Sequence, residues 1–338
     1  MDSLTHTVLG ACTGELIAGK KLGKKAMLIG AVVNNLPDID MFANFWHSQA
    51  EALLTHRGIT HSIFFMLIMS PALAWLGYKF MAKHGLSFKG WMFLITHGLV
   101  LHLGLDACTA YGTGWFEPFS SQRVSFNTLF ILDPLLMLPL LIAAITLLIM
   151  RAQNTKRAGL AGVALSLSGL YLLSSLVFKE IAHKAFVSSA QAQKISTDDH
   201  FETPTALNNL LWYAVINEDD HYKIGYYSVL DSKDSIEFKT VAGNHNLLLP
   251  YASNSDVRKL LQFSRGYYRI DSVSEEELLF SDVRFGQLMG CSSCDASFVF
   301  RYSISQKSNE TLVKQAEFQK TGKENLKALY DRVLGKGH

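Results

Sequence analysis

The sequence has few cysteines, little net charge and no basic region at its start, and each shortage excludes a class of protein. Four cysteines among 338 residues are too few for a disulfide scaffold. A net charge of +2 gives no reason to expect a nucleic-acid partner. Because Met1-Asp2-Ser3 leads into the first apolar segment without a basic residue, we do not expect a cleaved signal peptide.

The cysteines fall into two kinds. Cys12 and Cys108 lie in apolar segments and are expected to be small packing residues. Cys291 and Cys294 form a Cys-x-x-Cys pair in the charged half of the chain. One such pair indicates zinc only weakly, because a structural zinc site has four ligands. We expect a local disulfide instead if this half faces an oxidising compartment.

Charged residues are scarce up to about residue 180 and frequent beyond it. We predict a mainly α protein, with a polytopic helical membrane domain at residues 1–184 and a smaller α+β soluble domain at residues 185–338. Six apolar segments carry the membrane prediction, and the last four are candidates to cross a ~30 Å hydrocarbon core. The first two are short and are expected to form a hairpin, partly inserted or buried against the others. The segments are residues 4–19, 26–36, 62–78, 90–105, 128–150 and 158–178.

Lysine and arginine collect in alternate loops between these segments. The loops at residues 20–25, 79–89 and 151–157 carry them. Since basic loops stay on the cytoplasmic side, the pattern predicts a multi-pass protein of the cytoplasmic membrane with these loops inside. The other loops, and the soluble domain that follows the sixth segment, are then expected to face outward.

Histidine and aspartate gather at the opposite, outer ends of the segments. His102 and Asp106 are four residues apart, so a helix places both on one face. They are a pair of metal ligands or a ligand with the carboxylate that orients it. Ionisable residues inside membrane segments are costly and usually functional. We predict as metal ligands the residues that the alternation brings to the outer end: His6, Asp38, Asp40, His56, His61, His102 and Asp106.

Two further residues are candidates for catalysis, and both have a plainer interpretation. Asp133 is predicted to be a ligand or a carboxylate that orients one, although an aspartate before Pro134 is also typical of a helix N-cap. Arg57 lies between the first two loop histidines. Its guanidinium suits an oxyanion or a phosphate, but it equally suits the membrane surface.

Other polar residues are expected to be structural or solvated. Asp38 and Asp40 could form a solvated turn after Pro37, and Asp2 could cap the first helix. Histidines with no partner pattern are treated as structural or solvent-exposed: His47, His84, His183, His200, His221 and His245.

A mixed histidine–aspartate ligand set selects among metals. It suits zinc, manganese or iron better than calcium or magnesium, whose sites rarely include imidazole. We therefore predict a divalent transition metal, zinc first, as one or two ions. Such an ion with an open position lowers the pKa of bound water to about 7, and two ions ~3.5–4 Å apart favour in-line attack on phosphorus.

The second half shows short alternating runs instead of long apolar ones. Residues 210–216, 224–230 and 297–304 are expected to be strands, and residues 217–220 form a turn cluster between the first two. Helices are expected at residues 256–263 and 325–334. The internal chemistry of this domain is not readable from its residues.

The ordered motifs of the first half resemble a known family. They are Met1-Asp2-x-x-Thr5-His6, Leu36-Pro37-Asp38-Ile39-Asp40, His56-Arg57-Gly58-Ile59-Thr60-His61-Ser62, His102-x-x-x-Asp106, Ala110-Tyr111-Gly112-Thr113, Pro118-Phe119-Ser120 and Asp133-Pro134. Together they resemble the LexA-regulated, inner-membrane-associated metal-dependent hydrolases over roughly residues 1–180. The resemblance implies hydrolysis on a bound metal.

A second, more distant likeness concerns the His-x-x-x-Asp pair alone. It resembles zinc-dependent phospholipase C and P1-type nucleases, which cleave phosphoesters. That analogy implies zinc ligands at His61, His102, Asp106 and one of Asp38 or Asp40. The chain lacks a second clear pair of this kind, so a full three-metal site is not expected.

The combined prediction is a membrane-bound metal-dependent hydrolase that acts on a small-molecule or lipid phosphoester, such as a lipid headgroup, at the outer membrane face. Two alternatives stay open. One is a transporter in which His102, Asp106 and Asp133 form an ion pathway. The other is a membrane anchor for the soluble domain.

Overall fold

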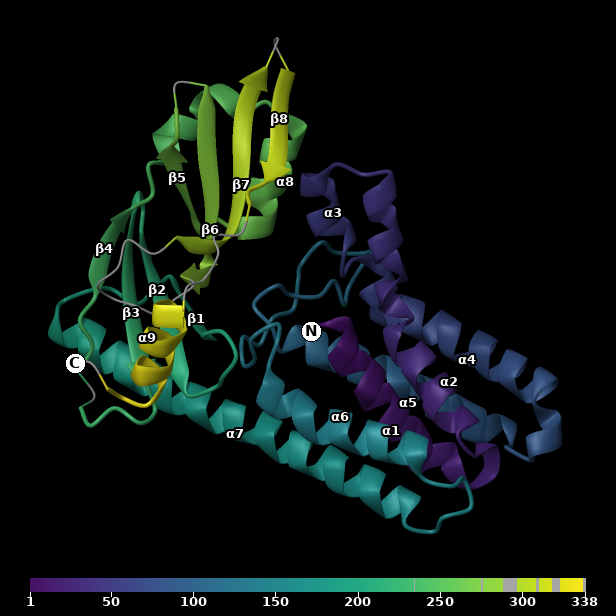
Figure 1. Ribbon diagram of the computed structural model, residues 1–338. Coiled ribbons are helices and arrows are strands. Elements are labelled where there is room, and N and C mark those ends of the chain that lie inside the picture. The colour runs from purple at the N-terminus through teal and green to yellow at the C-terminus, as the bar shows by residue number, and fades with distance from the viewer. Residues whose placement is uncertain (234, 275, 288–296, 308–309, 318–322, 337–338) are drawn as a thin grey trace. The chain divides into compact units, whose positions relative to one another are not determined.

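The computed structural model describes residues 1–233, 235–274, 276–287, 297–307, 310–317 and 323–336. Cys291 and Cys294 lie outside these residues, so their predicted disulfide stays a prediction. The chain forms two compact units (Figure 1). The first comprises residues 1–42 and 55–174, and the second comprises residues 43–54 and 175–338. The predicted fold class, a helical membrane part followed by a smaller α+β part, is confirmed.

The first unit is a bundle of apolar helices, and every segment predicted to be helical contains one (Figure 1). Short 3-10 turns connect them: η1 (Pro37–Phe45), η2 (Ile59–His61) and η3 (Ala82–His84). The helices are α1 (Ser3–Leu22), α2 (Lys25–Asn35), α4 (Ile63–Phe80), α5 (Phe88–Ala107), α6 (Pro134–Ile149) and the first part of α7 (Arg157–Ala192).

Glycines let α1 and α2 pack closely as the predicted hairpin. A Cβ added at Gly10 would lie 2.3 Å from the Gly30 carbonyl oxygen, and one at Gly14 would lie 2.1 Å from that of Ala26. Small residues at such crossings allow membrane helices to approach backbone to backbone. The close approach places the first turn of α1 beside the last turn of α2, where two site residues lie.

Two helix boundaries differ from the prediction. The fifth segment was expected to be helical from residue 128, but α6 begins at Pro134 and has 16 residues. The cause is local: proline disfavours helical backbone in the residue before it, and Asp133 instead caps the helix by accepting from Leu135 N and Leu136 N. The sixth helix continues to Ala192 and has 36 residues, well beyond the predicted end.

Three helices of the described chain are long and apolar enough to cross a membrane, namely α4, α5 and α7. The shorter α6 is also apolar. The basic loops meet at one end of the bundle, because Lys21 Nζ donates to the Gly85 carbonyl at 2.8 Å and Lys25 Nζ lies 3.1 Å from His84 Nε2. The alternation of loops inferred from the sequence is therefore present in the structure.

The second unit contains two antiparallel four-stranded sheets. Its helices are α3 (Gln49–Thr55), the 3-10 turn η4 (His245–Tyr251), α8 (Ser255–Ser264) and α9 (Lys323–Val333), joined by the last part of α7. The first sheet, in order, is β1 (His200–Pro204), β2 (Leu211–Glu218), β3 (His221–Ser228) and β4 (Lys239–Ala242). The second is β5 (Tyr268–Ser272), β6 (Glu277–Gln287), β7 (Phe298–Lys307) and β8 (Glu310–Gln315).

The predicted strands and helices of this half are present, with small differences at their ends. Glu218 pairs with His221, so the turn is the two-residue link Asp219-Asp220 rather than four residues. Asp219 has φ of 57°, the left-handed conformation that such hairpin turns require. The end of α7 packs on the first sheet, where Phe186 contacts the buried cluster around Trp212.

Candidate metal site

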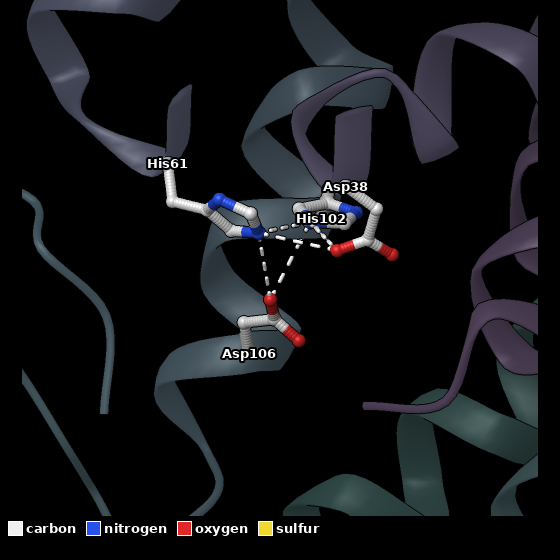
Figure 2. A group of neighbouring side chains, drawn as sticks. All are labelled: Asp38, His61, His102 and Asp106. Carbon is white, nitrogen blue, oxygen red and sulfur yellow. Dashed lines mark hydrogen bonds and ion pairs between the residues drawn. The ribbon is translucent and has the colours of Figure 1, made fainter. Parts of the chain in front are cut away.

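Four side chains from three elements of the first unit converge at one point (Figure 2). The closest approach joins the Nε2 atoms of His61 and His102, 3.0 Å apart. Asp38 Oδ1 lies 3.3 Å from His61 Nε2 and 3.7 Å from His102 Nε2. Asp106 Oδ2 lies 3.3 and 3.4 Å from the same two nitrogens. These are four ligand atoms of the type that transition metals bind.

The spacing of the four atoms fits a tetrahedral metal site. Bonds of 2.0–2.1 Å to nitrogen and oxygen place tetrahedral ligand atoms about 3.3 Å apart. The five measured separations, from 3.0 to 3.7 Å, surround that value. Asp106 Oδ2 is buried, and the groups nearest to it are the two histidine Nε2 atoms, at 3.3 and 3.4 Å, and Arg57 Nε, at 3.3 Å. A buried carboxylate is costly unless positive charge lies close to it, so this oxygen is suited to contact a metal ion as well as the guanidinium.

Local structure explains why these residues meet. Asp38 lies in η1 directly after Pro37, which ends α2, and His61 is the last residue of η2 before the N-cap Ser62 of α4. His102 and Asp106 lie on one face of α5, as the spacing of four predicts. Neighbouring ends of the bundle therefore supply the set, and all but Asp38 are fully buried.

Each histidine is held by its other ring nitrogen. His102 Nδ1 donates to the Asn34 backbone carbonyl at 2.5 Å. His61 Nδ1 donates to Asp40 Oδ2 at 3.1 Å, and the Thr60 hydroxyl donates to the same oxygen. Carbonyls and carboxylates in these positions fix the tautomer of metal-binding histidines. Both Nε2 atoms consequently face the centre of the cluster.

The electrostatics of the site favour a positive charge at its centre. Burial opposes the charged form of His61, but hydrogen bonds to Asp106, Asp38 and Asp40 outweigh it and raise its pKa to about 10. Burial also opposes the Asp40 carboxylate, yet hydrogen bonds from His56 and His61 hold its pKa well below the usual range. The pKa of Asp38 is likewise lowered against its burial, by His61 and His102.

Arg57 and His6 also contact Asp106, Arg57 at the oxygen that faces the two histidines and His6 at the other oxygen. Arg57 is buried, its Nε lies 3.3 Å from Asp106 Oδ2, and its Nη1 donates to the Thr109 hydroxyl at 2.7 Å. His6 Nε2 lies 3.1 Å from Asp106 Oδ1, which the Met1 α-amine also contacts. His6 is therefore joined to the cluster through Asp106 and through its ring, which stacks on that of His102 at 3.9 Å. Arg57 is engaged with the same carboxylate inside the protein.

Comparisons with known proteins place the first part of the chain in a family. The sequence model of the YdjM inner membrane protein family matches residues 1–182, more than half of the chain. The protein belongs to the YdjM family. Inner membrane protein YbcI of Escherichia coli is 29% identical over 122 residues, which is 36% of this chain and 69% of YbcI. Uncharacterized protein YfhP of Bacillus subtilis is 30% identical over 144 residues, 40% of this chain and 42% of YfhP.

These matches confirm an inner membrane protein and leave the finer predictions as they were. No solved structure matches the chain. The likeness to zinc-dependent phospholipase C and P1-type nucleases finds no support in the comparisons. The YdjM match ends at residue 182, so it covers the site of Figure 2 and stops before the strands of the second unit.

His56 and Asp40 form a second group of ligand atoms in this YdjM-family chain. His56 Nδ1 donates to Asp40 Oδ1 at 2.9 Å, and these two residues with Asp38 offer three atoms within 4.8 Å of one another. Asp38 belongs to both groups. The predicted choice between one ion and two corresponds to filling the first group alone or both groups.

Asp133 was also predicted to belong to the site, but its carboxylate makes its contacts outside the cluster. Its Oδ1 caps α6, and its Oδ2 accepts from the Tyr171 hydroxyl at 2.7 Å. The alternative interpretation of Asp133-Pro134 as the start of a helix is thus realised. Asp2 likewise caps α1 by accepting from Thr5 N.

Asn34 is a further residue of the site, and the sequence alone does not predict it. Its backbone carbonyl binds His102, its side-chain Oδ1 binds His6 at 3.2 Å, and its Nδ2 donates to the Gly98 carbonyl at 2.8 Å. The signal was a polar residue in the last turn of an otherwise apolar helix. That signal alone gives no partner, because Gly98 and His102 lie more than sixty residues further along the chain.

Asp40→Asn tests the orienting contact. The amide can still accept from the Thr60 hydroxyl, but it lacks the charge that holds His61, so zinc affinity is expected to fall about 10–100-fold. Zinc titration by calorimetry on detergent-purified protein measures this. Asp219→Asn, at the exposed hairpin turn of the second unit, is the matched control, and equal affinities in the two variants would contradict the role of Asp40.

Proposed function

We propose that this YdjM-family protein is a metal-dependent hydrolase with its metal at Asp38, His61, His102 and Asp106. The observation that carries the proposal is the convergence of these four ligand atoms at tetrahedral spacing. The Nδ1 atoms of both histidines are held by hydrogen bonds, to the Asn34 carbonyl and to Asp40, which orients the rings. A transporter that uses Asp133 is less favoured, because that carboxylate caps α6 and binds Tyr171.

The residues in and around the cluster have different proposed roles. When bound, a zinc-class ion supplies a Lewis acid and a source of hydroxide near neutral pH. Asp38, whose side chain is 11% exposed, is the one of the four proposed ligands that solvent reaches, and a substrate is proposed to approach from its side. His56 is 23% exposed, and Asp40 accepts from its Nδ1, which leaves Nε2 to accept a proton from water. Arg57 keeps the Asp106 carboxylate in place.

The two ends of the bundle support a proposed orientation in the membrane. The basic loops meet at one end, whereas η1, η2 and the last turn of α5 form the other. The positive-inside rule then puts the metal site at the non-cytoplasmic face. Because α7 starts at the basic end, the residues after it are proposed to lie outside as well. A cysteine introduced in residues 79–89 should react with an impermeant maleimide only from the cytoplasmic side.

An apolar cavity supports a lipid as the substrate. It has a volume of about 580 Å³ and runs between α1, α5, α6 and α7 in the first unit. Leu105 and Leu9 both line it; Leu105 is the neighbour of Asp106 in sequence, and Leu9 lies one turn after His6. An acyl chain in this cavity would leave a phosphate headgroup at the level of the site. We therefore propose a lipid phosphoester as the substrate.

Gly104→Leu tests the lipid proposal by filling the cavity. Gly104 lines it, and a Cβ there meets no atom within 4 Å, so the larger side chain enters open space. Displacing about two methylenes of an acyl chain costs about 1.6 kcal/mol, roughly 10-fold. Phosphate release from phosphatidic acid is expected to fall by that factor, and release from p-nitrophenyl phosphate by less than about twofold. Gly159→Leu, outside the cavity and equally uncrowded, is the control.

The hydrolase proposal itself is tested on full-length protein purified without chelators. We expect stoichiometric transition metal, phosphate release from one of these two substrates, loss of that release with a chelator and its recovery with zinc or manganese. Protein that is folded by circular dichroism but binds none of these metals overturns the proposal. Metal that is present, with no release from either substrate before or after reloading, overturns the phosphoesterase part.

A further inference from the structure

A second cluster of metal-ligating side chains lies in the second unit, outside the region that the YdjM match covers. It consists of His183 near the end of α7 and of His200 and Glu202 on β1. His200 and Glu202 are two residues apart on a strand, so both side chains point to the same face. The helix has 36 residues, about 54 Å, whereas a membrane core needs about 30 Å. The end that carries His183 therefore reaches past the bilayer.

The three side chains have the spacing of a metal site. Glu202 Oε1 lies 3.0 Å from His183 Nδ1 and 3.6 Å from His200 Nε2, again close to the tetrahedral ligand spacing of about 3.3 Å. The two imidazole rings stack at 5.5 Å with an interplanar angle of 26°. All three ligand atoms lie within 4.8 Å of one another.

The hydrogen bond behind His200 is the decisive contact. Its Nδ1 donates to the Thr197 carbonyl at 2.8 Å, because a carbonyl can only accept. In the neutral ring the Nε2 lone pair then faces the Glu202 carboxylate, and two electron-rich atoms repel each other. A cation between them removes the repulsion. The same device, a backbone carbonyl behind the imidazole, orients His102 in the first site.

Burial distinguishes the carboxylate from the two imidazoles. The Glu202 side chain is 3% exposed, whereas His183 is 41% and His200 28% exposed. A buried carboxylate needs positive charge nearby, and Lys179, one turn before His183 on α7, interacts electrostatically with it. The exposed rings leave the solvent side open, through which an ion can enter and on which water can complete its coordination.

We propose that His183, His200 and Glu202 bind a divalent transition ion of the zinc class. Two imidazoles and one carboxylate are a ligand set that zinc uses with water as the fourth ligand. The ion would join the end of α7 to the first strand of the second unit, residues 17 to 19 positions apart in sequence. This site is independent of the hydrolase proposal, because it shares no residue with the first cluster.

Zinc binding to full-length protein in detergent tests the site. Wild type is expected to bind one more zinc ion per chain than His183→Gln/His200→Gln, and zinc is expected to raise the unfolding temperature of the second unit only in wild type. His221→Gln, an exposed histidine on β3 of the same sheet, is the matched control and should keep the extra ion. Equal zinc stoichiometry in wild type and the double variant overturns the proposal.

Two further measurements distinguish loss of this metal site from unfolding of the protein and from loss of the metal at the first cluster. Glu202→Gln keeps the side-chain shape and should also lose the extra ion, with circular dichroism unchanged. Cobalt replaces zinc as a spectroscopic probe. In the double variant, the visible absorption should fall by the amount that one bound cobalt ion contributes. The ion held by His61 and His102 should remain bound. If the protonated histidines alone neutralise Glu202, cobalt absorption will be the same in all variants, which also overturns the proposal.

Discussion

His102→Ala is expected to leave the purified protein with little transition metal. His102 supplies one of four ligand atoms, and the other three cannot close around the gap because α5 and the bundle hold them in place. Loss of a group that only orients a ligand costs about 10–100-fold in affinity, so loss of a ligand should cost more than about 100-fold. Elemental analysis after size-exclusion chromatography measures the metal content, and zinc titration measures the affinity.

His97→Ala provides the control on the same helix. His97 is exposed, stacks on Phe93 and faces away from the cluster, so its removal should leave metal content unchanged. His61→Ala repeats the test from a different element and should match His102→Ala. If both ligand variants fold and retain the metal content of wild type, the assignment of the four ligands is wrong.

The part of the site that the sequence predicts depends on regular geometry. His102 and Asp106 could be paired because a helix repeats every 3.6 residues. His61 and Asp38 could be placed at the same end because apolar segments and basic loops alternate. What periodicity cannot supply is the role of each atom. The sequence treats Asp38 and Asp40 alike, but the turn of η1 sends Asp38 to the centre and Asp40 behind His61 and His56.

The cluster of His183, His200 and Glu202 could not be predicted from spacing in the sequence. His183 and His200 have no short spacing between them and were expected to be structural or exposed. They meet because α7 continues to Ala192 and the chain then returns as β1, and neither event has a local signal at His183. The end of a helix is also hard to predict from sequence when tertiary packing extends the helix. Phe186 of α7 is an example, because it contacts the core of the second unit.

Arg157 is another residue whose surroundings cannot be read from its place in the sequence. The sequence places it in a basic loop, but the structure buries it between α1, α6 and α7. Its Nε donates to Glu15 Oε1 at 2.8 Å and its Nη2 to Oε2 at 2.7 Å, while Nη1 binds the Met150 carbonyl at 3.1 Å. The two side chains are 2% and 3% exposed. Arg157, which the sequence places among the basic loop residues, is therefore one partner of a buried ion pair with Glu15.

Arg157→Leu is expected to lower the free energy of unfolding by about 3–5 kcal/mol, because it leaves the Glu15 carboxylate buried without its partner. Glu15→Leu/Arg157→Leu should recover most of this loss, since an apolar pair of similar volume is often neutral. Arg151→Leu, an exposed arginine of the same loop, should change stability by less than about 0.5 kcal/mol. Reversible unfolding in mild detergent measures all three. A double variant less stable than Arg157→Leu would show that the carbonyl contacts of the guanidinium, rather than its charge pairing, hold this end of the bundle together.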